Sequence, residues 1–391
     1  MGFRFNDELL LSEEDRNLAN SAYPNVYFAL DHPELRDEFQ RIDKLANAAK
    51  RASRRVGCAA LIFATLSLLT FPFALLLQGI FSEAQLREDF LLVLGILGAS
   101  FGILALIFGN LGLGFGRLKR KWLQQRLITE RLRQWHAQYL AAHAADIARV
   151  AGSDEDRGAW LAQRALAFAR FKRRFIDQIG SEYTKYTNVS AAAYSGQSIV
   201  DPRETVEFWI DKEWAKTAAQ RPENADDPHL AEFYRALEET RIRGQIQYTN
   251  YVLSSDGKFW SSPAKQLHIL GNLSYVLVLF SFIANFFALI AAIATGLLGQ
   301  GSDALWEVPS ALAIAFAILA VGARAMLEGL RPQRETRRMQ FYAAAVDHAA
   351  NRFAEARTHN KRIEAACLLE RASYDEMVEY ISSNERARFV L

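Results

Sequence analysis

Three side chains of the types that bind metal ions lie close together in this sequence: His136, His143 and Asp146. At these spacings they share one face of a helix. Imidazole and carboxylate groups suit zinc, but a zinc site needs a further ligand that the fold must supply. Solvated histidines on a helix surface are the more common origin of such a pattern. We therefore expect no metal site from these residues.

Other patterns that carry chemistry are absent or weak. The sequence contains no GxxxxGK[ST], HExxH or GxSxG motif. The run Gly112-x-Gly114-x-Gly116 is like a phosphate loop only in composition, because it ends an apolar helix and follows no strand. The acidic residues form no evident catalytic pair. We expect a protein that is not an enzyme and that holds no cofactor.

Basic and aromatic side chains alternate between Phe168 and Phe175. Stacking and charge in such a segment can hold an anionic ligand. The same pattern suits a helix that lies on anionic lipid, or one that packs its phenylalanines into a helical bundle. All three interpretations remain open for the basic residues of this patch, which are Arg170, Lys172, Arg173 and Arg174.

These candidate residues lie in a chain of 391 residues in which apolar and charged residues are segregated. Each of four apolar runs exceeds the about 18 residues that mark a candidate for crossing a bilayer. The sequence therefore predicts an all-α integral membrane protein with four transmembrane helices in two hairpins and a mostly helical cytoplasmic domain. The runs are Val56–Ile80, Phe90–Phe115, Leu267–Leu298 and Val308–Leu327.

Charge orients both hairpins in the same direction. Basic residues flank the outer ends of each hairpin, whereas the connections within the hairpins are acidic, and basic flanks remain in the cytoplasm. We expect a multi-pass protein of the bacterial inner (plasma) membrane with both termini cytoplasmic. The predicted segments are a cytoplasmic N-terminal segment (1–55), a first hairpin (56–116), a helical cytoplasmic domain (117–266), a second hairpin (267–330) and a long C-terminal cytoplasmic helix (331–391).

Overall composition narrows the expected partners. The 46 basic and 44 acidic residues nearly balance, so we expect no nucleic-acid binding. The two cysteines, Cys58 and Cys367, provide no disulfide framework. The lipid bilayer is the partner that the apolar runs predict directly.

The central feature is a helix predicted to run from Phe90 straight into basic sequence at Arg133. Small residues recur along it at alternating spacings of three and four, which places them on one face. Such a face permits close helix contact in lipid, and Gly98 and Gly102 form a GxxxG pair within it. We expect this face to pack helices together and to join copies of the chain into a homo-oligomer. Its residues are Gly95, Gly98, Gly102, Ala105, Gly109, Gly112 and Gly116.

Polar side chains within the apolar runs are costly in lipid and should face protein or water. A water-filled pore and an interhelical hydrogen bond explain them equally well. These residues are Asn110, Asn272 and Asn285.

Directly after the second run, Trp122, Arg126, Glu130 and Arg133 follow one another at successive helical turns. Ion pairs at spacings of four and three are available to them, and Trp122 suits the membrane interface. A solvated, salt-bridged helix and a role in oligomer contacts or gating both fit this motif. The long helices expected nearby are 122–150, 154–179 and an almost unbroken one at 333–381.

This Trp122-x3-Arg126-x3-Glu130 run after a two-helix hairpin resembles the SLATT family, as does the stretch from Arg241 through Gln245 to Tyr248 before the second hairpin. The resemblance implies two hairpin modules in tandem, although the second hairpin is not followed by the tryptophan motif. It also implies a membrane effector of a bacterial anti-phage or conflict system, controlled by a nucleotide second messenger or a sensor protein. A constitutive channel or transporter, and a membrane scaffold for cytoplasmic partners, are the alternatives.

Overall fold

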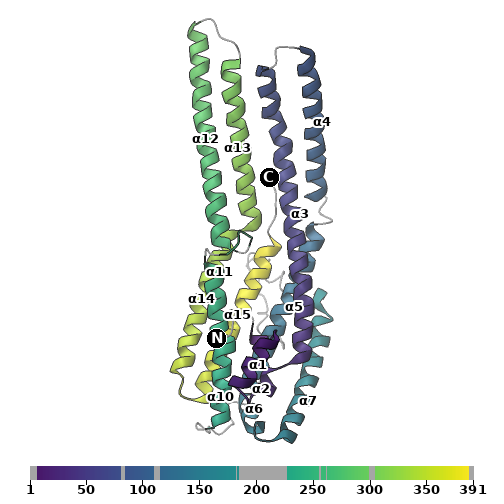
Figure 1. Cartoon of the computed structure of the whole chain (residues 1–391), viewed down its shortest axis with the longest axis vertical. Coiled ribbons are helices and arrows are strands. Elements are labelled where there is room, and N and C mark those ends of the chain that lie inside the picture. The colour runs from purple at the N-terminus through teal and green to yellow at the C-terminus, as the bar shows by residue number, and fades with distance from the viewer. Residues whose placement is uncertain are drawn as a thin grey trace, which may run out of the picture. The chain divides into compact units, whose positions relative to one another are not determined.

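The computed structural model describes residues 7–80, 84–109, 115–181, 183–184, 227–254, 257–260, 262–298 and 304–386. These residues are almost entirely helical and include no strand, which confirms the all-α prediction (Figure 1). The elements are η1 (Asp7–Leu9), α1 (Glu13–Ala22), α2 (Tyr27–Leu30), α3 (Pro33–Ile80), α4 (Ala84–Phe108), α5 (Phe115–Ala142), α6 (Ala144–Val150), α7 (Asp154–Phe171), η2 (Lys172–Ile176), α10 (Pro228–Leu237), η5 (Glu238–Ile242), α11 (Arg243–Leu253), α12 (Pro263–Leu298), α13 (Ala304–Leu330), α14 (Pro332–Glu355) and α15 (His359–Glu385).

Four helices are long and apolar enough to cross a membrane: α3, α4, α12 and α13. Large apolar side chains along them are exposed, including Phe71, Ile96 and Phe282 at 60%, 58% and 68%. Exposed apolar surface of this extent is unfavourable in water and suits a lipid environment.

The chain folds into two compact units, each built from separate stretches of sequence. The apolar unit contains the four apolar helices and spans residues 49–120 and 255–333. The polar unit spans residues 1–48, 121–254 and 334–386, so segments that the sequence separates by the apolar runs share one bundle.

Within the apolar unit, α3 and α4 pack side by side and antiparallel (Figure 1). Ser67 Oγ on α3 donates a hydrogen bond of 2.7 Å to the carbonyl oxygen of Gly98 on α4. A Cβ atom built on Gly98 would lie 2.6 Å from Thr70 Oγ1, so only glycine allows this approach. Close backbone contact is what a small-residue face provides between helices in lipid.

The predicted small-residue face therefore packs inside the chain. Positions Gly98, Gly102 and Gly109 all meet side chains of α3. A Cβ built on Gly95 or Gly116 meets no packing neighbour within 4 Å among the described residues. Because α3 of the same chain contacts Gly98, Gly102 and Gly109, this part of the face is not free to contact another copy. Ala105 is half-buried and Gly112 lies outside the described residues.

The expected continuous helix from Phe90 to Arg133 is wrong. Helix α4 ends at Phe108 and α5 begins at Phe115. Gly109 lies in a turn directly after α4, and a glycine costs a helix about 1 kcal/mol relative to alanine. A glycine of the predicted close-packing face thus also favours the end of the helix.

Helices α12 and α13 form a second antiparallel pair, joined by serine hydroxyls. Ser281 Oγ donates a hydrogen bond of 2.8 Å to the Ala313 carbonyl oxygen, and Ser274 Oγ reaches that of Ala320 at 3.4 Å. Asn285 is exposed and donates to the Ser281 carbonyl of its own helix, 3.1 Å away. The exposed Asn272 contacts only His268 of its own helix among the described groups. Neither asparagine bridges two described helices, and Asn110 lies outside the described residues.

The two helix pairs meet through α3 and α13. A Cβ atom on Gly322 would lie 2.9 Å from Thr65 Oγ1, and the sulfur atoms of Cys58 and Met326 are 3.6 Å apart. Residue numbers rise along α3 as they fall along α13, so these helices are also antiparallel. Arg54 on α3 donates to the carbonyl oxygen of Trp260, 3.1 Å away, just before α12. The basic flanks of both pairs therefore lie at the same end of the apolar unit.

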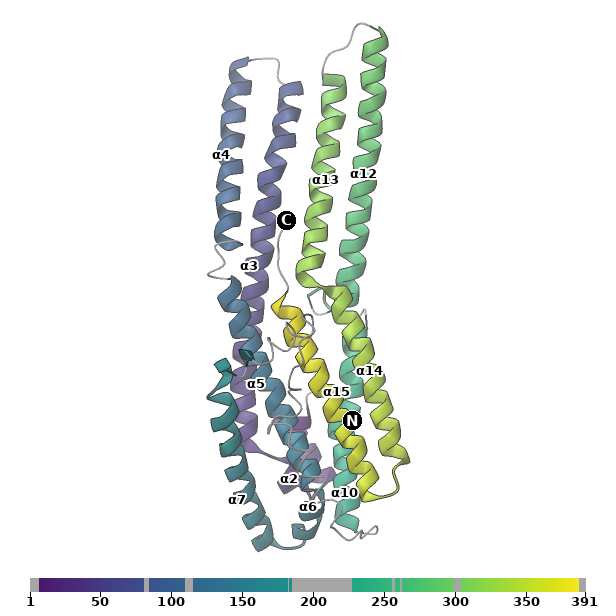
Figure 2. The same ribbon diagram turned by 180° about the vertical axis from the view of Figure 1, so that it is seen from behind.

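The polar unit contains shorter helices than the sequence predicts. The predicted helix 122–150 breaks at His143, between α5 and α6. The predicted helix 333–381 is two helices, α14 and α15, which lie side by side (Figure 2). Thr358 caps α15 by accepting a hydrogen bond from the Lys361 backbone, which stabilises the break. Folding α15 back on α14 lets each bury one face.

Candidate functional site

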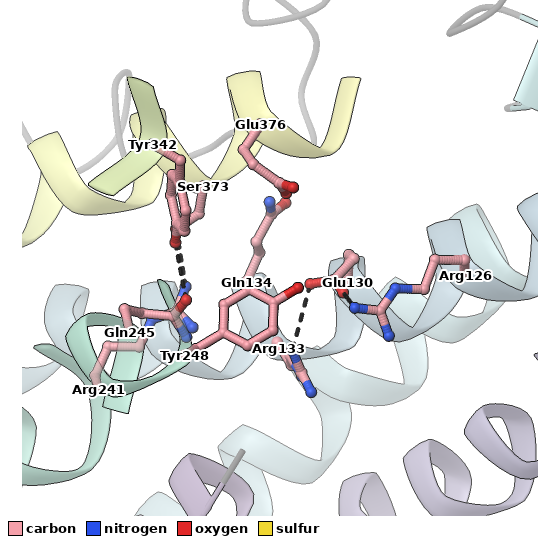
Figure 3. Close-up of a pocket in the computed structure, with 10 residues that line it drawn as sticks. All are labelled: Arg126, Glu130, Arg133, Gln134, Arg241, Gln245, Tyr248, Tyr342, Ser373 and Glu376. Carbon is pink, nitrogen blue, oxygen red and sulfur yellow. Dashed lines mark hydrogen bonds and ion pairs between the residues drawn. The ribbon is translucent and has the colours of Figure 1, made fainter. Parts of the chain in front are cut away.

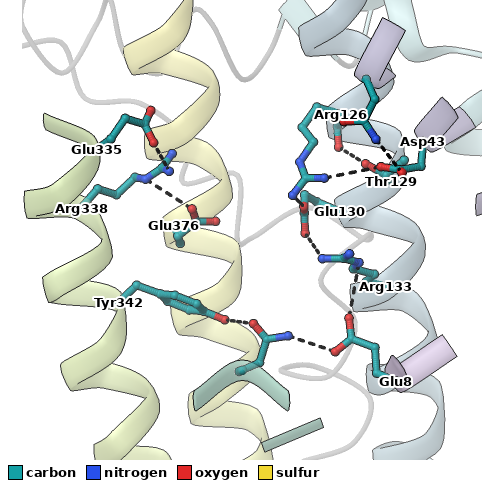
Figure 4. A network of polar contacts seen from close by, with 12 residues as sticks. Glu8, Asp43, Arg126, Thr129, Glu130, Arg133, Glu335, Arg338, Tyr342 and Glu376 are labelled. Carbon is teal, nitrogen blue, oxygen red and sulfur yellow. Dashed lines mark hydrogen bonds and ion pairs between the residues drawn. The ribbon is translucent and has the colours of Figure 1, made fainter. Parts of the chain in front are cut away.

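A cluster of charged side chains lies in the interior of the polar unit (Figures 3 and 4). We call it the polar core. Charged groups are rarely buried unless they are paired, so the partners of each group identify what the cluster can do. Its members are Glu8, Asp43, Arg126, Glu130, Arg131, Arg133, Arg241, Gln245, Tyr248, Glu335, Arg338, Tyr342, Glu370, Ser373 and Glu376.

Helix α5 provides the first row of ion pairs. Glu130 pairs with Arg126 one turn before it and with Arg133 Nη1 one turn after it, at 3.6 Å. Arg126 also reaches Asp43 Oδ1 on α3, at 3.8 Å, and Arg133 Nε lies 3.4 Å from Glu8 Oε1 (Figure 4). The predicted ion pairs at helical spacing are confirmed. They are mostly buried, since the side chains of Arg133, Glu130 and Arg126 are 7%, 18% and 23% exposed.

Arg241 connects its own element to two others, η1 and α15. Its Nη1 donates to Glu8 Oε2 and its Nε to Glu370 Oε1, each at 2.8 Å, while its Nη2 lies 3.4 Å from Ser373 Oγ. Arg241 belongs to η5, a π-helical turn between α10 and α11. Turns of this kind inside α-helices are frequent at functional sites.

Uncharged groups extend the same network toward α14. Gln245 Nε2 donates to Glu8 Oε2 at 3.0 Å, and its Oε1 accepts from the Tyr342 hydroxyl at 2.9 Å. The Tyr342 hydroxyl also lies 2.8 Å from Ser373 Oγ. The amide and the two hydroxyls thus join α11, α14 and α15 to the N-terminal turn, whose Glu8 is drawn in Figure 4.

Arg338 on α14 forms the second bridge to α15. It pairs with Glu335 of its own helix at 2.5 Å and with Glu376 Oε1 of α15 at 3.3 Å. Glu376 also lines a pocket of about 20 Å³ in this core (Figure 3). A space of this size holds about one water molecule. A nucleotide does not fit into it.

The two carboxyl groups that bind Arg241 have opposite pKa shifts. Burial opposes the ionisation of Glu8, but Arg241 and Arg133 outweigh it and hold its pKa below the usual range. Burial of Glu370 outweighs the attraction of Arg241 and raises the pKa of Glu370. The guanidinium of Arg241, between both acids, has a raised pKa and stays charged.

The structure brings together the two sequence segments that carry the family resemblance. Arg126, Glu130 and Arg133 of the first segment line the same pocket as Gln245 and Tyr248 of the second. Arg241 of the second segment lines this pocket too. Residues more than a hundred positions apart therefore belong to one site.

Trp122 lies in a different environment from the one that its sequence position suggests. The side chain is 5% exposed, and its ring lies 6.2 Å from that of Tyr380 on α15. Trp122 is thus a core residue of the polar unit. The expectation of an interfacial tryptophan is wrong, because α15, distant in sequence, covers this face of α5.

In the basic patch near the end of α7, the phenylalanine side chains face the interior and most of the basic side chains face solvent. The phenylalanines Phe168, Phe171 and Phe175 are buried, and Lys172 pairs with Glu34 at 3.2 Å. Packing into the bundle is therefore the correct interpretation of the aromatic residues, and they are not available to stack on a ligand or enter lipid. Arg170, Arg173 and Arg174 are exposed, with no acidic partner among the described residues.

Replacing Arg170, Arg173 and Arg174 together with serine is expected to leave the fold intact. Substitutions at exposed positions away from special contacts change stability by less than about 0.5 kcal/mol each. Thermal unfolding of the purified chain checks this, and a loss of several degrees would show that these side chains have structural partners.

The three residues considered for metal binding do not converge. His143 Nδ1 and Asp146 Oδ2 lie 3.2 Å apart near the start of α6. His136 is buried next to His32, with ring centroids 6.3 Å apart. Burial, together with the nearby Arg164, lowers the pKa of His136 to about 3, so this imidazole is neutral. The described residues include no group of three side chains placed to bind a metal ion.

Several members of the polar core carry no local signal in the sequence. Glu8, Glu370 and Glu376 are isolated acids in helical segments, and nothing in their spacing separates them from surface residues. Arg338 is different, because it lies among the buried positions Met339, Tyr342 and Val346 of α14. For these residues, the position of a charged side chain at the edge of an apolar stripe was the one indication of burial that the sequence offered.

Comparisons with models of known protein families, with curated proteins and with solved structures find no match for this chain.

Proposed function

We propose that the four apolar helices cross the bacterial inner membrane as two hairpins, with the polar unit and both termini in the cytoplasm. The antiparallel contacts within each helix pair and the shared level of Arg54 and Trp260 support this arrangement. Basic residues at that common end follow the rule for cytoplasmic flanks. Both native cysteines are buried, so a single cysteine placed at exposed Arg174 should be labelled from the cytoplasm only.

We further propose that the protein is a membrane effector of a bacterial anti-phage or conflict system. It would assemble into a homo-oligomer and open a gated pore, or disrupt the membrane, when a sensor protein or nucleotide messenger signals. The resemblance of the two segments in the polar core to the SLATT family supports this class of function.

One observation carries the proposal. Each of the four apolar helices is connected to the polar core. One of them contributes a side chain to the core, and each of the other three is adjacent along the chain to an element that contributes one. Helix α3 contributes Asp43 itself, α4 leads into α5, α11 leads into α12, and α13 leads into α14. In this proposal a rearrangement of the ion pairs would act on all four helices through these chain connections, as a gate requires.

Buried ion pairs suit such a role because they have few good arrangements. They contribute little net stability, since desolvation offsets much of their attraction, but a wrongly paired arrangement is costly. An element with discrete arrangements converts a small signal into a defined structural change. A purely structural bundle would achieve equal stability with an apolar core.

The decisive experiment measures membrane potential and growth in bacteria that express the full chain under phage challenge. Depolarisation and growth arrest are expected for the wild-type chain. An unchanged membrane potential would contradict the proposal. Transport of solute into liposomes without any activator would favour a channel or transporter instead. Full protection by a chain whose apolar helices are replaced with unrelated membrane anchors would favour a scaffold.

A further inference from the structure

Two carboxyl groups border the pocket of the polar core, Glu130 of α5 and Glu376 of α15, and Glu376 is the more weakly paired of the two. Its side chain is 15% exposed, and its described ion pair, with Arg338 Nε, is 3.3 Å long. The pocket that it lines has room for about one water molecule. A proton from solvent can therefore reach this carboxylate without unfolding the bundle.

The arginines near Glu376 are already paired with other acids. Arg338 binds Glu335 at 2.5 Å, within α14. Arg126 binds Glu130 within α5 and also faces Asp43. Glu376 thus competes for cations that have closer partners, and it faces the negative charges of those partners.

The charge balance of the polar core also leaves one carboxyl group without a cation of its own. Five guanidinium groups face six carboxyl groups, so the core has one surplus negative charge when every acid is ionised and none when one proton is bound. The other described groups that face Glu376 and can titrate are the phenols of Tyr248, from α11, and Tyr342, from α14. The cations are Arg126, Arg131 and Arg133 of α5, Arg241 of η5 and Arg338 of α14; the acids are Glu8 of η1, Asp43 of α3, Glu130 of α5, Glu335 of α14, and Glu370 and Glu376 of α15.

We propose that Glu376 is a proton-binding site that keeps the polar core closed, so that loss of its proton loosens α15 from α14 and α5. The proton comes from solvent and converts the carboxylate to a carboxylic acid; no other bond forms or breaks. The protonated acid keeps its place beside the Arg338 guanidinium, whose Nε lies 3.3 Å from Glu376 Oε1, while repulsion from Glu130 and Glu335 disappears.

The pH range of this site follows from its surroundings. Burial, opposed in part by Arg338, raises the pKa of Glu376 to about 7. The stabilisation by the bound proton is therefore complete below pH about 4.5, which is the pKa of the free side chain. It is lost as the pH rises through about 7. Neutral pH lies within this range, so small changes of cytoplasmic pH alter the occupancy.

Thermal unfolding of the full-length chain in detergent, measured between pH 5 and pH 8.5, tests the site. Glu376→Gln imitates the protonated acid. Its unfolding temperature should equal that of the wild type at pH 5 and exceed it by several degrees at pH 8.5. Glu379→Gln removes an exposed acid one turn away on α15, and its offset from the wild type should be the same at every pH. An offset for Glu376→Gln that does not change with pH would overturn the proposal.

The link to gating rests on the proposed function and needs its own measurement. Wild-type chain in dye-filled liposomes is expected to release more dye at pH 8 than at pH 6, and Glu376→Gln should remove this difference. Equal release by the wild type at both pH values would overturn the link to gating. Absence of release at any pH, with the unfolding result as expected, would refute the pore and retain the proton site.

Discussion

Replacing Arg241 with methionine is expected to lower the unfolding free energy of the polar unit by about 3–5 kcal/mol. The guanidinium lies between Glu8 and Glu370, 2.8 Å from an oxygen of each, and is itself 5% exposed. Methionine fills a similar volume but leaves both carboxylates buried without this cation. Chemical denaturation of the purified chain, followed by tryptophan fluorescence, measures the loss.

Arg243 offers a matched control two positions further along. Its side chain is 55% exposed and pairs with Glu238 and Glu239 at the surface. Exposed pairs are worth about 1 kcal/mol or less, so Arg243→Met should behave like the wild type. A similar loss for both variants would mean that burial of Arg241 is not the cause.

A compensating variant separates lost packing from uncompensated charge. Combining Arg241→Met with Glu8→Gln and Glu370→Gln removes the cation and both acids that bind it. Much of the stability should return, because buried ion pairs replaced as a set are often neutral in net effect. If the triple variant is no more stable than Arg241→Met alone, the charge argument fails.

Gly98→Leu is the second substitution with a large expected effect, in the apolar unit. Even a Cβ atom at this position would approach Thr70 Oγ1 to 2.6 Å, so the leucine side chain must push α4 away from α3. Overpacking of this kind costs about 1–3 kcal/mol, and the Ser67 hydrogen bond to the Gly98 carbonyl would lengthen as well. Thermal unfolding in detergent micelles measures the effect.

Gly95→Leu, three residues away on the same helix, is the control. In the part of the chain that the structure describes, a Cβ at this position meets no packing neighbour within 4 Å, so leucine there should leave the melting temperature nearly unchanged. Pairing Gly98→Leu with Thr70→Ala should recover part of the loss. If the oligomeric state falls in Gly98→Leu while the monomer remains as stable as the wild type, the glycine face joins copies and the intrachain assignment is wrong.

The sequence by itself determined that this protein is helical and where its long apolar helices lie. Four long apolar runs predicted the four helices that are apolar and long enough to span a membrane, because hydropathy and length are local properties. Ion pairs at α5 were also predictable, since Arg126, Glu130 and Arg133 follow helical spacing within one segment. The positions of the glycines predicted a close-packing face but not which helix would occupy it.

Only the tertiary structure decided which faces became interior. Trp122 and Arg133 are buried because α15 and the N-terminal turn reach α5 from opposite ends of the sequence. Glu8, Arg241 and Glu370 form one network across more than 350 residues, and no local pattern records such a meeting. Helix periodicity specifies which side chains share a face; the partner of that face depends on the packing of the whole chain. For the same reason the polar core, on which the proposed function depends, could not be read from its separate segments.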